Sequence, residues 1–342
     1  MTVNRQVVLA RRPQGMVERN CFEEAEAPVP EPANGQALLE VLYVAIDPGI
    51  RSWIDARGAG YLPAVEIGEP VRAAGIGRVI SSRSETHPVG ALVTCLTGWQ
   101  QYTLVGSDMS DLPRFGSPMP EGLDPIAAVS VYGQAANTAY AGIERVAQPK
   151  EGETVLVSAA ASAVGSLAGQ IAGIRGARVI GLAGSDEKCR WVVDDLKFDA
   201  CINYKKEDIA SRVRELCPKG IDIFFDNVGG EQLDTLLRRM AHGGRVILCG
   251  SLSTDNGSEP YRLRHYDRLM SKRASMTGFN VLDHWDLFPE SLKQVGEWVE
   301  SGRIRYRTQV LEGLETCPEA LIRLYQGDHL GKLIVQIASD PS

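Results

Sequence analysis

The chain has 342 residues, of which 44% are hydrophobic and 23% are charged, and its 36 basic and 43 acidic side chains give a net charge of −7. These values are typical of a globular protein and exclude a disordered, a collagen-like or a disulfide-stapled chain. The negative charge argues against nucleic acid as a partner, because phosphate backbones bind to basic surfaces. The length is enough for two domains of about 100–200 residues each.

The first 125 residues or so are rich in proline and glycine, and short apolar runs lie between their turn residues. This pattern predicts antiparallel strands that are joined by long loops. The expected strands are residues 37–46, 75–80 and 91–96. A last extended run, residues 332–337, is a candidate for a further strand of the same domain.

From residue 154 to about 280, apolar strands alternate with amphipathic helices. The expected strands are residues 154–158, 178–183, 201–203, 221–226, 245–249 and 274–279, and the expected helices are residues 163–175, 186–195, 208–217 and 232–240. Such alternation predicts right-handed crossovers and a doubly wound parallel sheet. In a sheet of this kind a ligand binds beyond the carboxyl ends of the strands.

The first strand–helix turn of this region consists of small residues, Ser158-Ala-Ala-Ala-Ser-Ala-Val-Gly165. Small side chains let the backbone approach a pyrophosphate, and the helix N-terminus offers unbonded N–H groups. The GxGxxG motif is incomplete, because Ala160 and Ser162 stand at its first two glycine positions. A buried alanine-rich helix without a ligand would give the same turn, and the surrounding alternation favours the nucleotide.

The end of the second strand favours NADP(H) over NAD(H). NAD sites usually have Asp or Glu there to bind the ribose hydroxyls, whereas this strand is followed by Gly184 and Ser185, with Lys188 one turn later. These residues offer neutral donors and a positive charge to a 2′-phosphate, although Lys188 could equally be an ordinary solvated lysine. Asp186 and Glu187 suit the first turn of a helix, where the dipole favours acids.

Later strands also end in small or polar residues, Asp226-Asn-Val-Gly-Gly230 and Cys249-Gly-Ser251. Their clustering at one edge is more informative than any single motif. The sequence has no HExxH, GxSxG or P-loop motif, and its five histidines lack ligand-like spacing. Cys21, His87 and Cys95 lack the further residues that a catalytic zinc site needs, so no metal is expected.

The seven cysteines are irregularly spaced, and no signal-like apolar segment begins the chain. Both features indicate a cytoplasmic protein with reduced thiols. The uncharged stretch of residues 154–174 is too rich in serine, alanine and glycine for a convincing membrane span. Neither a membrane nor a nucleic acid is therefore expected as a partner.

Short segments along most of the chain follow the order and spacing of a known family. They are residues 46–51, 67–72, 75–77, 98–102, 138–140, 163–166, 169–170, 183–189, 202–204, 225–230, 249–250, 278–279 and 331–332. In these segments the chain resembles the medium-chain dehydrogenase/reductase superfamily, in its zinc-independent branch of prostaglandin, alkenal and curcumin double-bond reductases.

The resemblance implies an α/β fold of two domains and commonly a homodimer. Residues 1–127, completed by residues 303–342, would form a GroES-like β-barrel domain for substrate and catalysis, and residues 128–302 a Rossmann domain for NADPH. With the strand-end residues above, the candidate cofactor contacts are Ser162, Val164, Gly165, Ser166, Gly184, Ser185, Lys188, Tyr204, Asn227, Cys249, Gly250, Ser251, Phe279 and His329. Of these, Lys188 and Tyr204 would lie near the 2′-phosphate.

The sequence departs from the family mainly on the substrate side. Asp255 stands where a tyrosine is frequent, and residues 131–137 bring polar side chains to a usually apolar substrate wall. Ser162 replaces a glycine and His329 an asparagine. The cofactor is therefore carried over more readily than the substrate.

The activity implied is NADPH-dependent reduction of the activated C=C bond of α,β-unsaturated ketones or aldehydes, with hydride transfer to the β-carbon. A tyrosine or water would protonate the α-carbon, and the candidate tyrosines are Tyr261, Tyr61 and Tyr132, each with a packing or surface role as the alternative. Two other functions stay open. One is a quinone reductase or alcohol dehydrogenase of the same fold, and the other is an NADP(H)-binding protein without turnover.

Overall fold

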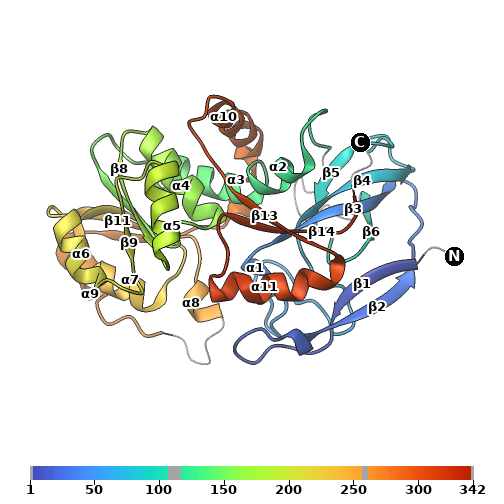
Figure 1. Ribbon diagram of the computed structural model, residues 1–342, viewed down its shortest axis with the longest axis horizontal. Helices are drawn as coiled ribbons and strands as arrows, with labels where there is room; N and C mark the ends of the chain where they lie inside the picture. Colours follow the sequence, from blue (N-terminus) through green and yellow to red (C-terminus); the bar gives the residue numbers. More distant parts are fainter. Residues whose placement is uncertain (1–2, 107–115, 117, 256–260, 340–342) are drawn as a thin grey trace. The chain divides into compact units, whose positions relative to one another are not determined.

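The computed structural model describes residues 3–106, 116, 118–255 and 261–339 (Figure 1). The chain divides into two compact units, Met1–Gly133 with Thr308–Ser342, and Gln134–Arg307. The domain boundaries expected from the sequence, after residues 127 and 302, lie a few residues before these. In the described part of the chain, no helix has the length and apolar character that a membrane crossing requires.

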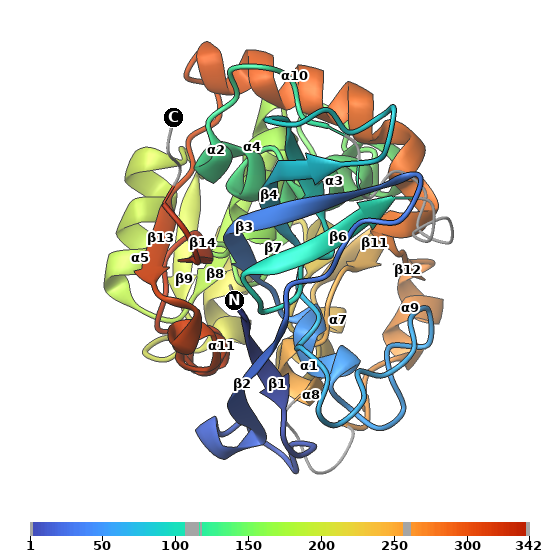
Figure 2. The ribbon, with the colours of Figure 1, turned by 90° about the vertical axis from the view of Figure 1, so that its right-hand side faces the viewer.

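The first unit is built around one long strand, β3 (Gln36–Ile46). One edge of β3 pairs with β4, and the other pairs with β6 and then with β14, all antiparallel (Figure 2). The other strands of this unit are β4 (Gly75–Ser82), β5 (Leu92–Cys95), β6 (Tyr102–Gly106), β13 (Thr308–Glu312) and β14 (Lys332–Gln336), and β1 (Val3–Leu9) pairs separately with β2 (Phe22–Pro28). The final strands of the chain, β13 and β14, thus join the same sheet as β3, β4 and β5.

Helices of the first unit are short, apart from one near the C-terminus. They are η1 (Arg19–Cys21), α1 (Gly49–Trp53), α2 (Pro125–Ser130), η6 (Leu314–Thr316) and α11 (Cys317–Gln326). The Lys332 side chain on β14 is almost fully buried, donates to the carbonyl of Ile46 and forms an ion pair with Asp47. Tyr325 on α11 donates to the carbonyl of Pro48 at 2.7 Å. These bonds attach the C-terminal segment to the turn that follows β3.

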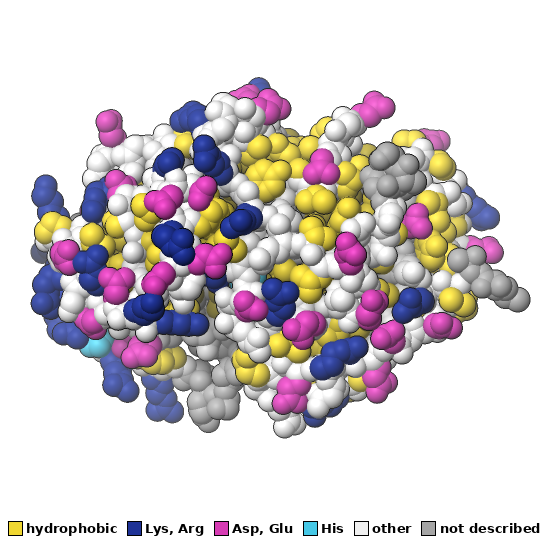
Figure 3. Space-filling view, in the orientation of Figure 1, with side chains coloured by type: hydrophobic (Ala, Val, Ile, Leu, Met, Phe, Trp, Pro, Cys, Tyr) yellow, Lys and Arg dark blue, Asp and Glu magenta, His cyan; other side chains and the backbone are white. Residues whose placement is uncertain are grey.

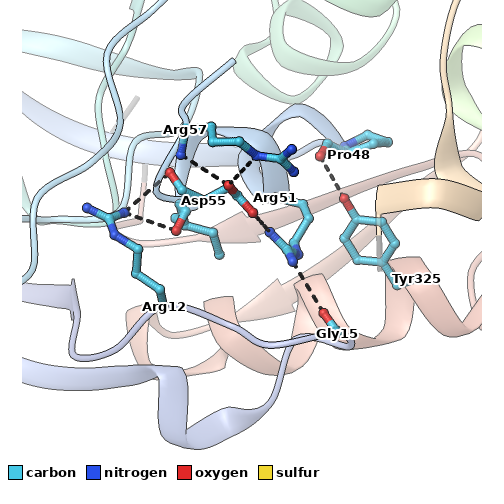
Figure 4. A network of polar contacts seen from close by, with 8 residues as sticks. Arg12, Gly15, Pro48, Arg51, Asp55, Arg57 and Tyr325 are labelled. Carbon is cyan, nitrogen blue, oxygen red and sulfur yellow. Dashed lines mark hydrogen bonds and ion pairs between the residues drawn. The ribbon is translucent and has the colours of Figure 1, made fainter. Parts of the chain in front are cut away.

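A cluster of arginines surrounds the end of α1 (Figure 4). Asp55 accepts hydrogen bonds from Arg51 at 3.2 Å and from Arg57 at 3.4 Å. Arg12 donates to the carbonyl of Asp55, and the buried Arg51 also donates to the carbonyl of Gly15. The Arg51 guanidinium thus bridges α1 and the loop before η1.

The second unit contains a six-stranded sheet in the order β12-β11-β10-β7-β8-β9, in which every pair is parallel. This is the doubly wound Rossmann order, with its reversal between β7 and β10. The strands are β7 (Thr154–Val157), β8 (Arg178–Ala183), β9 (Ala200–Asn203), β10 (Ile221–Asp226), β11 (Met240–Leu248) and β12 (Ser275–Gly278). Leu156, Ile180 and Phe224 from three neighbouring strands belong to one fully buried cluster.

From β7 onward the helices of the second unit alternate with its strands, and α4 and α5 pack beside β8 (Figure 1). They are α3 (Gln134–Ala141), the π-helical turn η3 (Gly142–Ala147), α4 (Ala163–Ile174), α5 (Asp186–Arg190), the π-helical turn η4 (Trp191–Asp195), α6 (Ile209–Leu216), α7 (Gly230–Leu237), α8 (Leu252–Asp255), α9 (Asp267–Lys272), η5 (Val281–Leu287) and α10 (Phe288–Glu300).

The helix expected at residues 232–240 differs most from the structure. Helix α7 begins and ends earlier, and Met240 instead starts β11, where it pairs with Ile221 of β10. The two glycines at 243 and 244 lie inside β11, next to a register shift in this pairing. The apolar periodicity predicted a helix that reaches residue 240, but Met240 instead forms strand pairing with β10.

The surface carries charges of both signs. On the face drawn in Figure 3, basic and acidic side chains are interspersed.

Candidate functional site at the carboxyl edge of the parallel sheet

The ends of β7 and β10 are joined by a buried hydrogen-bond network at the point where the strand order reverses. Ser158 donates from its hydroxyl to Asp226 at 2.8 Å, and the same hydroxyl accepts from the backbone N–H of Asn227 at 2.8 Å. The Asn227 amide donates to the carbonyl of Ser158 at 2.8 Å. Burial raises the pKa of Asp226, against the opposing effect of its hydrogen bonds from Val228, Gly229 and Ser158. The sheet edge at which a ligand is expected thus carries a buried polar network.

The turn from β7 into α4 leaves no room for a side chain at Gly165. A Cβ atom there would lie 2.3 Å from the carbonyl oxygen of Ala159. Ala159 itself has a positive φ of 49°, a conformation that favours glycine. Ser162 has extended backbone angles and caps α4, because its hydroxyl accepts from the N–H of Gly165 at 3.2 Å. Ser162, which stands where the family has glycine, therefore caps the helix and has an unstrained backbone conformation.

The N-terminus of α4 is the part of this turn that can bind an anion. Ala163 and Val164 occupy the first two helical positions, and their N–H groups have no acceptor within the helix. Both residues are partly exposed. Ser166 is buried, and its hydroxyl donates back to the carbonyl of Ala163. The backbone of residues 163–164, rather than the Ser166 hydroxyl, is thus available to a pyrophosphate.

Two residues that follow β9, Tyr204 and Lys205, lie over the end of β8. The Tyr204 hydroxyl would lie 2.8 Å from a Cβ atom at Gly184, so the ring lies over the end of this strand. Lys205 reaches the same point, with its Cε 3.4 Å from that position. Ser185 caps α5 by accepting from the N–H of Lys188 at 3.2 Å. Burial raises the pKa of Tyr204, so its hydroxyl is protonated and can donate a hydrogen bond.

The first acid after this strand end, Asp186, is bonded to residues that follow β9 or end it. Asp186 accepts from the Asn203 amide and forms an ion pair with Lys206, each at 2.5 Å. These two bonds, that from Lys206 being the stronger cause, lower the pKa of Asp186. Asp186 is therefore ionised and already paired, unlike the acid that binds the ribose in a typical NAD site.

Three predicted contacts lie together where β10 and β11 end. The backbone N–H groups of Cys249 and Gly250 both donate to the carbonyl of Asp226. A Cβ atom at Gly250 would lie 2.9 Å from the carbonyl oxygen of Asn227, so a side chain would separate the two loops. Ser251 follows and is exposed. Burial and the nearby Asp226 raise the pKa of the Cys249 thiol to about 12.

Phe279 follows β12 and has a packing role. Its ring lies edge-on to Phe225, with ring centres 6.4 Å apart, and would come within 2.8 Å of a Cβ atom at Gly142. These contacts place Phe279 on the interior side of the sheet edge. Its contact with a cofactor stays a prediction.

Of the three candidate tyrosines, only Tyr261 belongs to the second unit. Its hydroxyl is 3.3 Å from Asp234, and partial burial together with this acid raises its pKa. Asp234 also accepts from the backbone N–H groups of Arg264 and His265, so Tyr261 is one part of a loop anchor. The side chain of Asp255 lies outside the described residues.

Tyr61, Tyr132 and His329 belong to the first unit. Tyr61 is about half exposed, Tyr132 follows α2 and His329 precedes β14. Their expected roles toward substrate or cofactor stay predictions.

Sequence reasoning missed Lys205 and the bond between Ser158 and Asp226. Lys205 could have been found as the second residue after the third strand, beside Tyr204. The bond between Ser158 and Asp226 joins residues 68 positions apart and depends on which strands are neighbours. No pattern in the neighbouring sequence predicts this bond.

Two family descriptions match the chain. Residues 5–112 match "N-terminal domain of oxidoreductase", and residues 163–301 match "Zinc-binding dehydrogenase". Over the described ranges, no three His, Cys, Asp or Glu side chains are grouped so that they could hold a metal ion.

Relatives that match along almost the whole chain identify the family more narrowly. The chain is 36% identical to NADPH-dependent curcumin reductase of Escherichia coli and 34% identical to the NADP(+)-dependent 2-alkenal reductase of Nicotiana tabacum, in each case over 98% of both chains. It superposes on the crystal structure of CurA in complex with NADPH from Vibrio vulnificus with a TM-score of 0.91 and 35% identity, over 98% of this chain and 100% of that one. This likeness confirms the predicted α/β fold class. The chain therefore belongs to the medium-chain dehydrogenase/reductase superfamily, in its branch of double-bond reductases.

Proposed function

We propose that this protein reduces the activated C=C bond of α,β-unsaturated ketones or aldehydes and uses NADPH as its cofactor. The reaction class is supported by relatives along the whole chain that are named for curcumin and 2-alkenal reduction. The cofactor is supported by a neighbour of the same length that was crystallised with NADPH.

The hydrogen-bond donors at the end of β8 are the observation that supports NADPH most strongly, because they fit a 2′-phosphate. Ser185, Tyr204 and Lys205 offer two hydroxyls and a positive charge around Gly184, and Lys188 lies one turn into α5. Asp186, the first acid after this strand end, is paired with Lys206. A 2′-phosphate there would therefore meet cationic and neutral donors.

The turn into α4 fits a pyrophosphate. The N–H groups of residues 163 and 164 would bind its oxygens, and Gly165 lets the backbone pack closely below them. When bound, NADPH supplies the hydride that adds to the β-carbon of the substrate. The chain has to hold the substrate carbonyl against a hydrogen-bond donor, and a tyrosine or water has to supply the proton for the α-carbon.

Tyr261, Tyr61 and Tyr132 are the candidates for the proton donor, with water as the alternative. The bond between Tyr261 and Asp234 gives Tyr261 a structural role, so we rank Tyr61 and Tyr132 beside it rather than below it. Phe variants of all three separate them, and Tyr266→Phe is the matched control because Tyr266 is well exposed. The donor variant should lose kcat at unchanged KM for NADPH, while full activity in a variant removes that tyrosine.

One assay tests the function. The purified protein is mixed with NADPH or NADH and with an enone, an enal or a quinone, and both cofactor consumption and product mass are followed. A saturated product formed with NADPH is the expected result. Turnover of the quinone alone would indicate the quinone reductase, and NADPH binding without turnover would indicate the non-catalytic alternative.

We further propose a homodimer in the cytoplasm. Strand β12 forms one edge of the parallel sheet, and among the described residues no strand pairs with its outer side. An unpaired edge is a template for a second chain. All seven cysteines are free, which suits a reducing compartment. Light scattering at several protein concentrations should give the mass of a dimer, and a monomer throughout would contradict this.

A further inference from the structure

We propose that Asp234 is a positioning residue for the reduction, because its carboxylate holds part of the segment between β11 and β12 against α7. The hydrogen bonds of this anchor are given by the structure. Its effect on the reaction rests on the proposed function, since it assumes that the nicotinamide half of NADPH binds beside this segment.

The Asp234 side chain lies on α7 and is only 3% exposed. One of its oxygens accepts from the backbone N–H groups of Arg264 and His265, at 2.7 and 2.8 Å. The other oxygen accepts from the His265 ring nitrogen Nδ1 at 3.0 Å and from the Tyr261 hydroxyl at 3.3 Å. One carboxylate thus fixes both backbone and side chains of residues 261–265.

The anchor suits an ionised carboxylate, which only accepts hydrogen bonds. Burial opposes the charged form of Asp234, but the N–H groups of His265 and Arg264 and the His265 ring lower its pKa. Because the carboxylate donates nothing, the proton of a neutral His265 ring has to be on Nδ1. The position of this proton is a direct reporter of the anchor.

The N-terminal side of α7 also holds the beginning of the same segment. Ser253 donates to the carbonyl of Val228 from its backbone N–H at 3.0 Å and from its hydroxyl at 2.7 Å. Gly230 begins α7, and a Cβ atom there would overlap the Ser253 hydroxyl. The chain that leaves β11 is therefore attached at Ser253, beside the start of α7, and again at residues 261–265.

This segment starts at the half of the sheet edge where the hydride would be transferred. In a doubly wound sheet a dinucleotide lies across the point where the strand order reverses, here between β7 and β10. The 2′-phosphate belongs to the adenosine half, so its proposed position at the end of β8 puts the nicotinamide half toward β10 and β11. Gly250 and Ser251, which follow β11, are among the predicted cofactor contacts.

Loss of the Asp234 carboxylate should therefore lower turnover more than it lowers binding of the phosphate half. Among the described residues, the hydrogen bonds of Asp234 lead to residues 261–265 and not to β8 or to the N-terminus of α4. Asp234 acts through the segment that it holds.

The experiment compares the full-length wild type with Asp234→Ala, Asp234→Asn and the control Glu231→Gln. Glu231 is an exposed acid in the first turn of the same helix, so its variant removes the same charge and leaves the anchor intact. Amide hydrogen exchange and ¹⁵N NMR of the His265 ring report the anchor. Titration with 2′,5′-ADP reports the phosphate half, and kcat and KM for 3-penten-2-one with NADPH report the reaction.

In the wild type we expect slow exchange at the N–H groups of Arg264 and His265 and a ring proton on Nδ1. Asp234→Ala should lose this protection and about tenfold in kcat, as for the loss of a hydrogen bond to a charged group, with unchanged affinity for 2′,5′-ADP. Glu231→Gln should behave as the wild type.

Asp234→Asn should restore part of the activity and tests the proposal even where the alanine variant does not fold. Its amide oxygen can still accept the two backbone bonds, and its NH₂ group now donates to Nδ1. We therefore expect slow exchange, a ring proton moved to Nε2, and a loss of only about threefold in kcat, because fewer bonds are lost.

Fast exchange at both N–H groups of the wild type would overturn the anchor. An unchanged kcat in Asp234→Ala, or a loss of 2′,5′-ADP affinity as large as the loss of kcat, would overturn the positioning role. A wild type that binds NADPH and reduces no enone would contradict the proposed function and the positioning role with it. The exchange data would still decide whether the anchor exists.

Discussion

The carboxyl edge of the parallel sheet has two halves that are built differently. At the ends of β7 and β10, Ser158, Asp226 and Asn227 are buried and bond to one another and to the backbone. At the ends of β8 and β9, the partly exposed Tyr204 and the exposed Lys205 lie over Gly184. The first half fixes the course of the backbone that any dinucleotide would meet. We propose that the second half presents the charges that select among dinucleotides.

The largest effect is expected in the first half, from Gly165→Ala. The new Cβ would lie 2.3 Å from the carbonyl of Ala159, and such overpacking costs about 1–3 kcal/mol of unfolding free energy. We also expect loss of NADPH binding, because the turn must open. Urea unfolding and fluorescence titration measure both.

The matched control is Gly173→Ala in the same helix. Its Cβ would meet only the side chain of Val179, at 3.7 Å, and alanine favours a helix by up to about 1 kcal/mol. This variant should be as stable as the wild type or more so. Equal losses in both variants would show that the tight contact at Gly165 is not the cause.

Ser158→Ala comes next. It removes the donor to one oxygen of Asp226 and the acceptor of the Asn227 N–H, and all of these groups are buried. Leaving such groups without a partner costs about 1–3 kcal/mol. We expect a lower urea midpoint and an equal weakening of NADPH and NADH binding. A change in the preference between the two would contradict the separation of the two halves.

In the second half, Lys205→Ala and Lys188→Ala should change selectivity with little effect on stability. Lys205→Ala removes a positive charge near Gly184, and Lys188→Ala removes one that lies one turn into α5. For each variant we expect the dissociation constant for NADPH to rise about tenfold, the equivalent of about 1.4 kcal/mol. Binding of NADH should stay the same. Lys219→Ala, an exposed lysine before the amino end of β10, is the control. A similar loss there would point to general charge rather than to a site.

The smallest effect concerns acid stability. Because Lys206 and Asn203 lower the pKa of Asp186 below its ordinary value of 3.8, this group stabilises the fold above that value. The contribution is lost as the pH falls through the lowered pKa. Asp186→Asn should therefore flatten the pH dependence of the urea midpoint between neutral pH and acid. An unchanged slope would show that the ion pair with Lys206 contributes nothing.

The strands that carry the candidate site were predictable, because buried parallel strands are continuous apolar runs. The expected strand at residues 178–183 coincides with β8, and that at residues 221–226 coincides with β10. The N-terminus of α4 was likewise marked by Ser162, a good helix cap. Strand β2 was missed, since its sequence, FEEAEAP, is rich in residues that disfavour strands.

What the sequence could not reveal depends on contacts between distant residues. The positive φ of Ala159 occurs at a residue that does not favour it, and nothing in the local sequence marks it. The bond between Ser158 and Asp226 joins the ends of two strands that are 68 residues apart in the chain, so no local pattern predicts it.

The central claim is that hydride passes from NADPH to the β-carbon of an activated C=C bond. The most direct measurement uses NADPH deuterated at the transferring position with 3-penten-2-one, and product analysis by mass spectrometry and NMR. The account predicts saturated 2-pentanone with one deuterium at the former β-carbon. Deuterium at the carbonyl carbon, in an unsaturated alcohol, would contradict it.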